Sequence, residues 1–432
     1  MNSLYIMNGN LRLDNNPAVE YAASHGIKVL PVIIMDARID LSGGASRWWT
    51  EEILKSISKR TGVSDILFFM DLGEYMHRIN SMIREKKIDE ILIHNIPRKR
   101  YTFLVNEMIE AFGSKVSVKK FDSNNLLKLE EMENINVNFN NFNSFFQKMK
   151  KRDMGKMNES SDIPEFIDPE INQLRRNSPW KEKLKKIWNV SISKDDILNK
   201  SLKDGRKNNS RISPFISHGQ IDVKDIWKES QGNEFEDEIM RNLAWREFFY
   251  LSYFKKENMD RIEVNEKFRN FPWSTRSEDF LTWKAGNTGF PLIDGAMKQL
   301  WAEGWINNRL RMLVSDFLVK CLLIRWDFGA NWFMDTLVDA DESVNFSSWQ
   351  YISGTGGFSW PFFRIFNPVK NENDLDPEGN YIRKWIPELN NDVWKEAENI
   401  KNMRKNNLSK YSDMRKRALK IYEDFINNNL GA

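Results

Sequence analysis

Two stretches in the second half of the sequence place polar side chains among apolar ones. Residues 288–312 read TGFPLIDGAMKQLWAEGWINNRLRM, and residues 336–368 read TLVDADESVNFSSWQYISGTGGFSWPFFRIFNP. Their notable polar side chains are Asn307, Asn308, Arg309, Arg311, Asp339, Asp341 and Asn345. A buried Arg needs a carboxylate and a buried carboxylate needs donors, so Arg311 and Asp339 are the natural pair.

These residue types favour a planar ligand that is rich in heteroatoms. An aromatic heterocycle can stack on an indole such as Trp305 and exchange hydrogen bonds with Asn and Asp side chains. The alternative is a polar clamp between helices, which would hold their packing register without any ligand.

Tryptophan and charge are both distributed unevenly along the 432 residues. Of the 16 Trp, only Trp48 and Trp49 precede residue 150. The net charge of +3, from 64 basic and 61 acidic residues, excludes a uniformly basic surface. Two segments are nevertheless basic: 148–211, with 17 Lys/Arg against 10 Asp/Glu, and Lys401–Lys420, with 8 against 1. They indicate either a phosphate-binding surface or two solvated helix faces.

Several classes of protein are excluded by composition. A single cysteine, Cys321, rules out internal disulfides and Cys-rich metal sites. The four histidines (His25, His77, His94 and His218) have no ligand spacing, so we expect no metal. No apolar run approaches the ~20 residues that a membrane span needs, and no signal peptide is present. We therefore expect a cytoplasmic monomer without membrane contact.

The first 125 residues alternate short apolar runs with amphipathic segments. The runs are Leu4–Met7, Val29–Met35, Ile66–Met70, Ile91–His94 and Val116–Val118, and the helical segments are Asn16–Ser24, Arg47–Lys59, Leu72–Lys86 and Tyr101–Phe112. This alternation predicts a doubly wound, Rossmann-like α/β domain with a parallel sheet of five strands. The first strand leads into Met7-Asn8-Gly9-Asn10, which is not a GxGxxG fingerprint.

The remainder of the chain is predicted to be helical after a connecting region. The Asn-rich stretch Asn134–Asn143 favours neither helix nor strand. From about residue 212 the pattern is helical, with examples at Glu236–Phe254, Pro291–Glu303, Asn308–Trp326 and Ser409–Asn427. We predict an α/β domain at 1–125, a connection at 126–200 and an all-α domain at 201–432.

Six ordered motifs in the second half resemble the photolyase/cryptochrome family. They are SRISP (210–214), NLAWREF (242–248), TGFP (288–291), GWINNRLRM (304–312), FRIFNP (363–368) and YIRKWIPEL (381–389), and LRLDNNP (11–17) resembles the opening motif. The likeness is greatest to class I-type cyclobutane pyrimidine dimer DNA photolyases. It implies an α/β antenna domain followed by an all-helical domain that binds FAD.

The resemblance also assigns residues to the flavin and to electron transfer. The FAD-binding set would be Asn209, Ser210, Arg211, Ile212, Ser213, Arg246, Asn308, Arg311, Asp339, Asp341 and Asn345. Trp349, Trp326 and Trp273 would carry electrons from the surface to the flavin, although any one of them could be a core aromatic. Asn345 would face the flavin N5, and Asn at this place is typical of the repair enzymes.

The implied substrate is a pyrimidine dimer in UV-damaged DNA, flipped out of the duplex. The residues that contact the dimer would be Asn242, Trp245, Asn308, Met312 and Tyr351. Arg206 could hold a backbone phosphate of the DNA. Photolyases of this type usually have Glu where Asn242 stands, and Trp where Tyr351 stands. Asn307 replaces a His on which (6-4) photolyases depend, which disfavours that lesion.

An antenna chromophore is the least determined part of the resemblance. Asn106 and Glu107 resemble a pair that binds methenyltetrahydrofolate, but they equally suit a polar step on a helix. A deazaflavin, a second flavin or no antenna are the alternatives.

The sequence thus predicts a DNA-repair lyase, a deoxyribodipyrimidine photolyase that acts by photoreactivation. Electron transfer from photoexcited reduced FAD would split the flipped-out dimer. The alternatives are a cryptochrome-like flavin photoreceptor with little or no repair activity and an electron-transfer flavoprotein that works in the dark.

Overall fold

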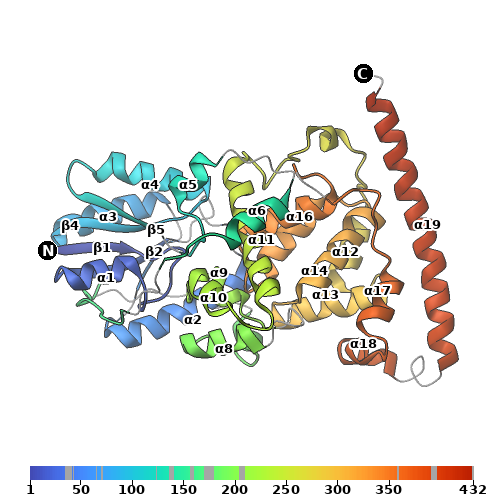
Figure 1. The fold of residues 1–432 in the computed structure, drawn as a ribbon, viewed down its shortest axis with the longest axis horizontal. Helices are drawn as coiled ribbons and strands as arrows, with labels where there is room; N and C mark the ends of the chain where they lie inside the picture. The colour runs from blue at the N-terminus through green and yellow to red at the C-terminus, as the bar shows by residue number, and fades with distance from the viewer. Residues whose placement is uncertain are drawn as a thin grey trace. The chain divides into compact units, whose positions relative to one another are not determined.

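A computed structural model describes the chain from Met1 to Leu430 with internal gaps. The described residues are 1–34, 41, 43–64, 66–69, 72–122, 124–135, 141–155, 160–169, 180–203, 210–357, 360–390 and 397–430. They form two compact units (Figure 1). Unit 1 comprises Met1–Glu257 and Val338–Val344, and unit 2 comprises Asn258–Leu337 and Asn345–Ala432.

Unit 1 contains a parallel sheet of five strands in the order β3-β2-β1-β4-β5. The strands are β1 (Asn2–Ile6), β2 (Lys28–Ile34), β3 (Leu67–Phe69), β4 (Ile88–Asn95) and β5 (Ser117–Asp122). The order reverses direction between β1 and β4, as in a doubly wound fold. The predicted five-stranded α/β domain is confirmed.

Helices connect the strands and cover the sheet. They are α1 (Pro17–Ser24), α2 (Gly44–Thr61), α3 (Leu72–Glu85) and α4 (Lys99–Phe112), close to the predicted segments. Leu4 and Ile6 of β1 share one core with Ile79 of α3 and Leu104 of α4, because side chains two residues apart on a strand point to the same face. Asn16 caps α1 by accepting from the Ala18 and Val19 amides.

The rest of unit 1 is helical. Its helices are α5 (Leu129–Asn134), α6 (Phe142–Lys150), α7 (Lys181–Leu184), α8 (Lys194–Lys203), α9 (Ser213–Ser217), α10 (Val223–Glu229) and α11 (Glu236–Lys255). The Asn-rich stretch spans the end of α5 and the start of α6, and its residues 136–140 lie outside the described part. α6 and α5 both pack on α11, so α11 supports the segment that follows the sheet.

Helices also make up the regular structure described in unit 2. They are η2 (Glu266–Asn270), α12 (Ser277–Ala285), α13 (Pro291–Glu303), α14 (Asn308–Asp316), η3 (Phe317–Cys321), α15 (Trp326–Thr336), α17 (Pro368–Leu375), α18 (Asn380–Trp385), η4 (Pro387–Asn390) and α19 (Ala397–Leu430). α16 (Glu342–Ser353) begins in unit 1 and continues in unit 2. α13 packs against α12, α14, α17 and α18, and the helical domain expected from the sequence is confirmed.

One predicted helix, Asn308–Trp326, is wrong as a single element. α14 ends at Asp316, a π turn follows, and Leu323 adopts a φ of 60° before α15 begins. Lys320 is fully buried within this turn, where its Nζ lies 2.8 Å from Asp316 Oδ1 and donates to Arg364 O at 3.0 Å. Because the segment is buried all round, its apolar pattern continues across the break and hides it.

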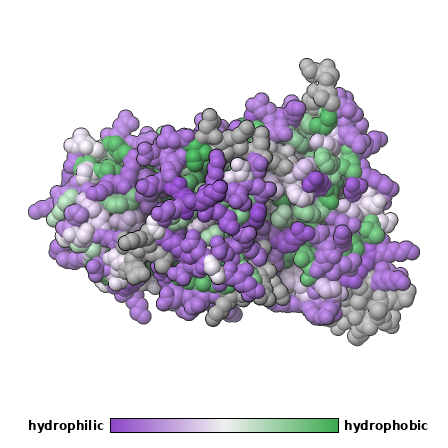
Figure 2. Space-filling view, in the orientation of Figure 1, coloured by the Kyte–Doolittle hydropathy of each residue, from purple (hydrophilic) through white to green (hydrophobic). Residues whose placement is uncertain are grey.

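The two compact units meet at other residues than the domain boundaries predicted from the sequence. The described helices between residues 126 and 257 are grouped with the sheet in unit 1. The assignment of domains to 1–125, 126–200 and 201–432 stays a prediction. Within the described residues, no helix combines the length and the apolar composition that a membrane crossing requires. Hydrophilic residues cover most of the face shown in Figure 2.

A buried histidine makes unit 1 sensitive to acid. Burial lowers the pKa of His94 to about 3, and its Nε2 lies 2.8 Å from the Tyr5 hydroxyl. The unfolded chain takes up a proton near pH 6.5 and the folded chain does not, so the free energy of unfolding falls with pH below 6.5 by up to about 1.4 kcal/mol per unit. His94→Gln should flatten this dependence between pH 6.5 and 4 in denaturant titrations. An unchanged slope would refute the assignment.

Candidate functional site

A buried polar cluster in unit 1 surrounds Asp341, one of the predicted flavin contacts. Its Oδ2 lies 3.0 Å from Arg98 Nη2 and accepts from the Tyr250 hydroxyl, and its Oδ1 accepts from the Val344 amide at 3.1 Å. Arg246, another predicted flavin contact, lies over the Tyr250 ring at 4.4 Å. The cluster joins the residue before α4, helix α11 and the residue before α16, so residues far apart in the sequence hold Asp341.

The electrostatics of this cluster keep Asp341 ionised. Burial alone would raise its pKa, but the charges of Arg98 and Arg246, together with the hydrogen bonds from Tyr250 and the Val344 amide, outweigh burial, and the pKa lies below its ordinary value. Burial and the Asp341 carboxylate raise the pKa of Tyr250 to about 12, so its hydroxyl stays protonated and donates. Sequence reasoning missed Arg98 and Tyr250, because nothing local connects them with Asp341.

Some buried donors near the predicted flavin contacts are unsatisfied. Among the described residues, no hydrogen-bond partner is found for Arg246 Nη1, although Glu247 Oε2 lies 3.8 Å away, nor for Ser343 Oγ. Burying such groups unpaired is costly, so they suit a ligand rich in acceptors.

The loop before α9 carries the predicted phosphate-binding residues. Ser210, Arg211, Ile212 and Ser213 are all half-buried. Arg211 adopts a φ of 53° and its guanidinium lies 4.3 Å from the Trp188 ring centroid. Asn209 and Arg206 lie outside the described residues.

Trp245, predicted to contact substrate, belongs to an aromatic stack in unit 1. Its ring lies parallel to Phe142 of α6, with centroids 3.7 Å apart, and it also contacts Phe248 and Phe249 of α11. Trp245 remains half-exposed, and Asn242, one turn earlier, is exposed. Phe142 was missed because the Asn-rich pattern just before it gave no sign of a helix. The aromatic spacing of Phe142 and Phe146 was the available signal.

The three predicted electron-transfer tryptophans all lie in unit 2. Trp326 and Trp349 are buried, and Trp273 is half-buried against Phe271, at 4.5 Å between centroids. Trp326 Nε1 donates to Glu263 Oε1 at 3.2 Å, and Glu263 also pairs with Arg325. Trp349 contacts Phe333 and Trp283 edge-on. The structure thus gives each tryptophan an apolar or carboxylate environment.

Asn345 lies one helical turn before Trp349 on α16 and is buried. Its Nδ2 donates to Ala330 O of α15 at 2.9 Å, so its Oδ1 is the atom that can accept from a ligand. Trp349 approaches the same helix at Gly329, where a Cβ would lie 2.1 Å from Trp349 Cη2. Gly329 is therefore required for the position of the ring.

Replacement of Gly329 by Ala should displace Trp349. Overpacking of this kind costs about 1–3 kcal/mol, and we expect a lower melting temperature and slower light-driven flavin reduction. Gly295→Ala on α13 is a matched control, since its nearest neighbour lies 3.3 Å from the added Cβ. Transient absorption checks the prediction, and photoreduction as fast as in the control would contradict it.

The start of α14 carries a mixture of structural and accessible polar groups. Asn307 caps the helix by accepting from the Leu310 amide, which explains an Asn at this position. Asn308 is exposed and Met312 half-buried, whereas Arg311 Nε donates to Ile306 O at 2.8 Å. Arg311 and buried Asp339 belong to different units, so their pairing stays a prediction.

An exposed aromatic and basic surface follows α16 in unit 2. We call it the 360–366 loop surface, and its members are Trp360, Phe363, Arg364 and Phe366. Phe363 is 53% exposed, Trp360 stacks on Phe366 at 5.6 Å, and Arg364 lies 5.5 Å from the Trp360 ring. The backbone carbonyl of Tyr351 accepts a hydrogen bond from the Trp360 amide, and the Tyr351 residue is half-exposed. Large exposed aromatics beside cations are typical of nucleic-acid contacts.

Other motif residues have structural roles. Asp294 accepts from the amides of Thr288 and Gly289, which shapes the TGFP turn before α13. Glu247 is buried and accepts from the Leu127 amide. Asn106 and Glu107 lie on an exposed side of α4, and their antenna role stays a prediction.

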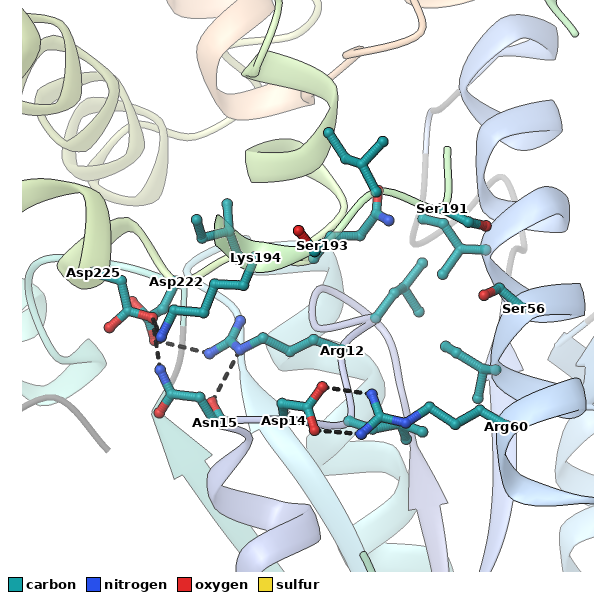
Figure 3. A pocket seen from close by; sticks show the side chains of 17 residues that line it. Arg12, Asp14, Asn15, Ser56, Arg60, Ser191, Ser193, Lys194, Asp222 and Asp225 are labelled. Atoms are coloured by element: carbon teal, nitrogen blue, oxygen red, sulfur yellow. Dashed lines mark hydrogen bonds and ion pairs between the residues drawn. The ribbon is translucent and has the colours of Figure 1, made fainter. Parts of the chain in front are cut away.

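The LRLDNNP motif lines a pocket of about 550 Å³ in unit 1 (Figure 3). Arg12 lies 2.8 Å from Asp222 and donates to Gly219 O, and Asn15 Nδ2 donates to Asp225. The motif thereby anchors the loop after β1 to the region before α10. None of the predicted site residues that the structure describes lines this pocket. No group of three or more potential metal ligands is found among the described residues.

The comparisons with known proteins agree with this architecture. Residues 3–165 match the family model "DNA photolyase", and residues 239–427 match "FAD binding domain of DNA photolyase". The chain is 30% identical over 377 residues to a deoxyribodipyrimidine photo-lyase of Buchnera aphidicola, covering 80% of this chain and 68% of that protein. It is 29% identical over 426 residues to Cryptochrome-2 of Arabidopsis thaliana, covering 88% and 69%.

A solved structure is also similar over nearly the whole length. A bacterial class III photolyase from Agrobacterium tumefaciens superposes with a TM-score of 0.84 at 26% identity, covering 98% of each chain. The chain therefore belongs to the photolyase/cryptochrome family, and FAD is its cofactor. The expected class I type stays a prediction.

Proposed function

We propose that the protein is a light-driven DNA repair enzyme that splits cyclobutane pyrimidine dimers. Residues 3–165 match the family model of DNA photolyase, and the observation that carries the proposal is the 360–366 loop surface with Phe363 and Arg364 exposed. Exposed aromatic side chains beside cations can stack on bases and attract phosphates, which suits a protein that binds DNA.

Trp245 and Tyr351 would flank the flipped-out dimer. Trp245 offers an indole whose plane is set by Phe142, and Tyr351 offers a smaller ring with a hydroxyl. Unstacking costs a few kcal/mol in an intact duplex and less at a distorted lesion, so aromatic contacts of this size can offset it. Asn242, Asn308 and Met312 would contact the dimer's edges.

FAD in its reduced state supplies the electron that opens the dimer and receives it back. Ser210, Arg211, Ile212, Ser213 and the adjacent Asn209 would bind its phosphates. Its ring would be contacted by the polar residues Arg246, Asn308, Arg311, Asp339, Asp341 and Asn345.

The Asn345 Oδ1 would accept a hydrogen bond from the flavin, since its Nδ2 already donates to Ala330 O. The unsatisfied Arg246 Nη1 supports an acceptor-rich ligand beside Asp341. Trp273, Trp326 and Trp349 would return the flavin to its reduced state after oxidation, because indoles form accessible cation radicals in apolar surroundings.

The proposal is tested by illuminating reduced protein with oligonucleotides that carry one dimer. Chromatography should show repaired cyclobutane dimer and unchanged (6-4) photoproduct, because Asn307 is engaged as a helix cap and is no proton donor. Repair of neither lesion would refute it.

A second candidate is a flavin photoreceptor with little repair. The similarity to Cryptochrome-2 and the Asn at the exposed position 242 favour it. Asn242→Glu distinguishes the two: a photolyase should repair at least as well with the longer carboxylate, whereas a photoreceptor should gain no repair.

A further inference from the structure

The final helix, α19 (Ala397–Leu430), carries eight basic residues between Lys401 and Lys420, and they divide into two sets. Three are bound to the body of unit 2. Arg404 Nε pairs with Glu372 Oε1 at 2.9 Å, Lys410 Nζ donates to Thr288 O at 2.8 Å, and Arg417 Nη2 donates to Cys321 O at 2.9 Å. These three cations therefore attach α19 to the rest of unit 2.

The other five basic side chains are exposed, and within the described part of the chain no contact of theirs with the body of unit 2 is found. We call them the α19 stripe: Lys401, Lys405, Arg415, Lys416 and Lys420. At 3.6 residues per turn they occupy an arc of about 140°. The buried residues Tyr411, Ala418 and Phe425 lie outside this arc, where they pack on the body of unit 2.

The stripe is not neutralised by the protein. Within the described part of the chain, none of its five cations forms an ion pair, in contrast to Arg404. Two described acidic residues lie near the stripe: Asp413 at the border of the arc, and exposed Glu423 within it, three residues after Lys420. Five like charges on one surface repel each other, so an anionic partner would stabilise them.

The dimensions of the stripe suit a duplex backbone. Lys401 and Lys420 are 19 residues apart, which is about 28 Å along a helix and about eight base pairs of DNA. An acidic peptide could also bind cations, but the regularly spaced phosphates of a duplex match a row of cations over this length without a shaped groove.

The helix that carries the stripe packs on the segment that carries the 360–366 loop surface. Tyr411 donates to Ile365 O at 3.3 Å, and Tyr422 stacks on Phe362 with centroids 4.9 Å apart. α19 is thus attached to the segment that carries Phe363 and Arg364. Figure 1 shows α19 as a long helix at the border of its unit.

We propose that the α19 stripe binds the phosphates of duplex DNA that contacts the 360–366 loop surface. The inference rests on the proposed function, because that function makes DNA the binding partner. It adds a contact that does not depend on the base sequence of the DNA. Its effect is on affinity and salt dependence and not on the light-driven step.

The test compares three forms of the full chain on undamaged 30-base-pair duplex by fluorescence anisotropy at several salt concentrations. One variant changes the five stripe residues to Gln. The control removes the same charge from exposed positions on unit 1, by changing Lys55, Lys59, Arg84, Lys115 and Lys120 to Gln. The slope of log K against log salt should become shallower by up to about 4.5 in the stripe variant, at about 0.9 per phosphate, and by less than about 1 in the control.

Equal slopes in the stripe variant and the control would overturn the inference. So would a stripe variant that loses binding to phosphatidylserine vesicles and keeps its DNA slope, because the partner would then be a lipid surface. Repair of a saturating ten-base oligonucleotide with one dimer should be the same in all three forms. If even the unmodified protein fails to repair, the proposed function fails, while the salt slopes still decide the role of the stripe.

Discussion

Trp326→Phe should abolish most light-driven reduction of the oxidised flavin and leave repair by chemically reduced protein intact. Trp326 is fully buried and donates to Glu263, whose carboxylate favours a positive charge on the indole. Phe keeps most of the packing but cannot supply an accessible cation. A barrier increase of about 3 kcal/mol, or about 100-fold in rate, is the expected scale. Transient absorption of the flavin measures it.

Trp227→Phe is the control for this substitution. Trp227 is also fully buried, but it lies in unit 1 on α10 and outside the proposed electron path. It should lose stability without losing photoreduction. Equal photoreduction in the Trp326 variant and the wild type would show that the chain of Trp273, Trp326 and Trp349 is a packing feature.

Trp245→Ala should weaken binding of dimer-containing DNA by about 10- to 100-fold, since stacking on an aromatic side chain contributes about 1–3 kcal/mol per base. Phe142→Ala should have a smaller effect in the same direction, because the parallel contact at 3.7 Å fixes the Trp245 plane. Competition between damaged and undamaged oligonucleotides measures both losses. Binding to undamaged DNA should change little.

A purely structural role of Phe142 makes a different prediction. Phe142→Ala would then lower the melting temperature without changing the preference for damaged DNA, and Phe142→Tyr would not matter for either. If the preference survives in both the Trp245 and Phe142 variants, the aromatic stack is not part of the substrate site.

The sheet could be predicted from the sequence because each strand is marked by the pattern of residues within its own short segment. Apolar runs such as Val29–Met35 are short and rich in β-branched residues, and the order of five such runs with helical segments between them implies a doubly wound fold. The break at Lys320 could not be predicted, since the ion pair with Asp316 is buried within an otherwise apolar segment.

Residues of the candidate site were predicted only where they belong to motifs that resemble those of the family. Asp341, Trp245 and Asn345 were named by resemblance, but their supports come from distant segments: Arg98 for Asp341, Phe142 for Trp245. Such contacts depend on the packing of α4 and α6, which no local pattern encodes. The structure also shows that Arg12 anchors the loop after β1 and that Asp294 shapes the turn before α13.

The most direct test of light-driven dimer repair is absorbance of thymine in an oligonucleotide with one cyclobutane dimer. Fully reduced protein should restore that absorbance under illumination over many turnovers, with no change in the dark. No restoration in the light by reduced protein that holds its FAD, or equal restoration in the dark, would contradict the account.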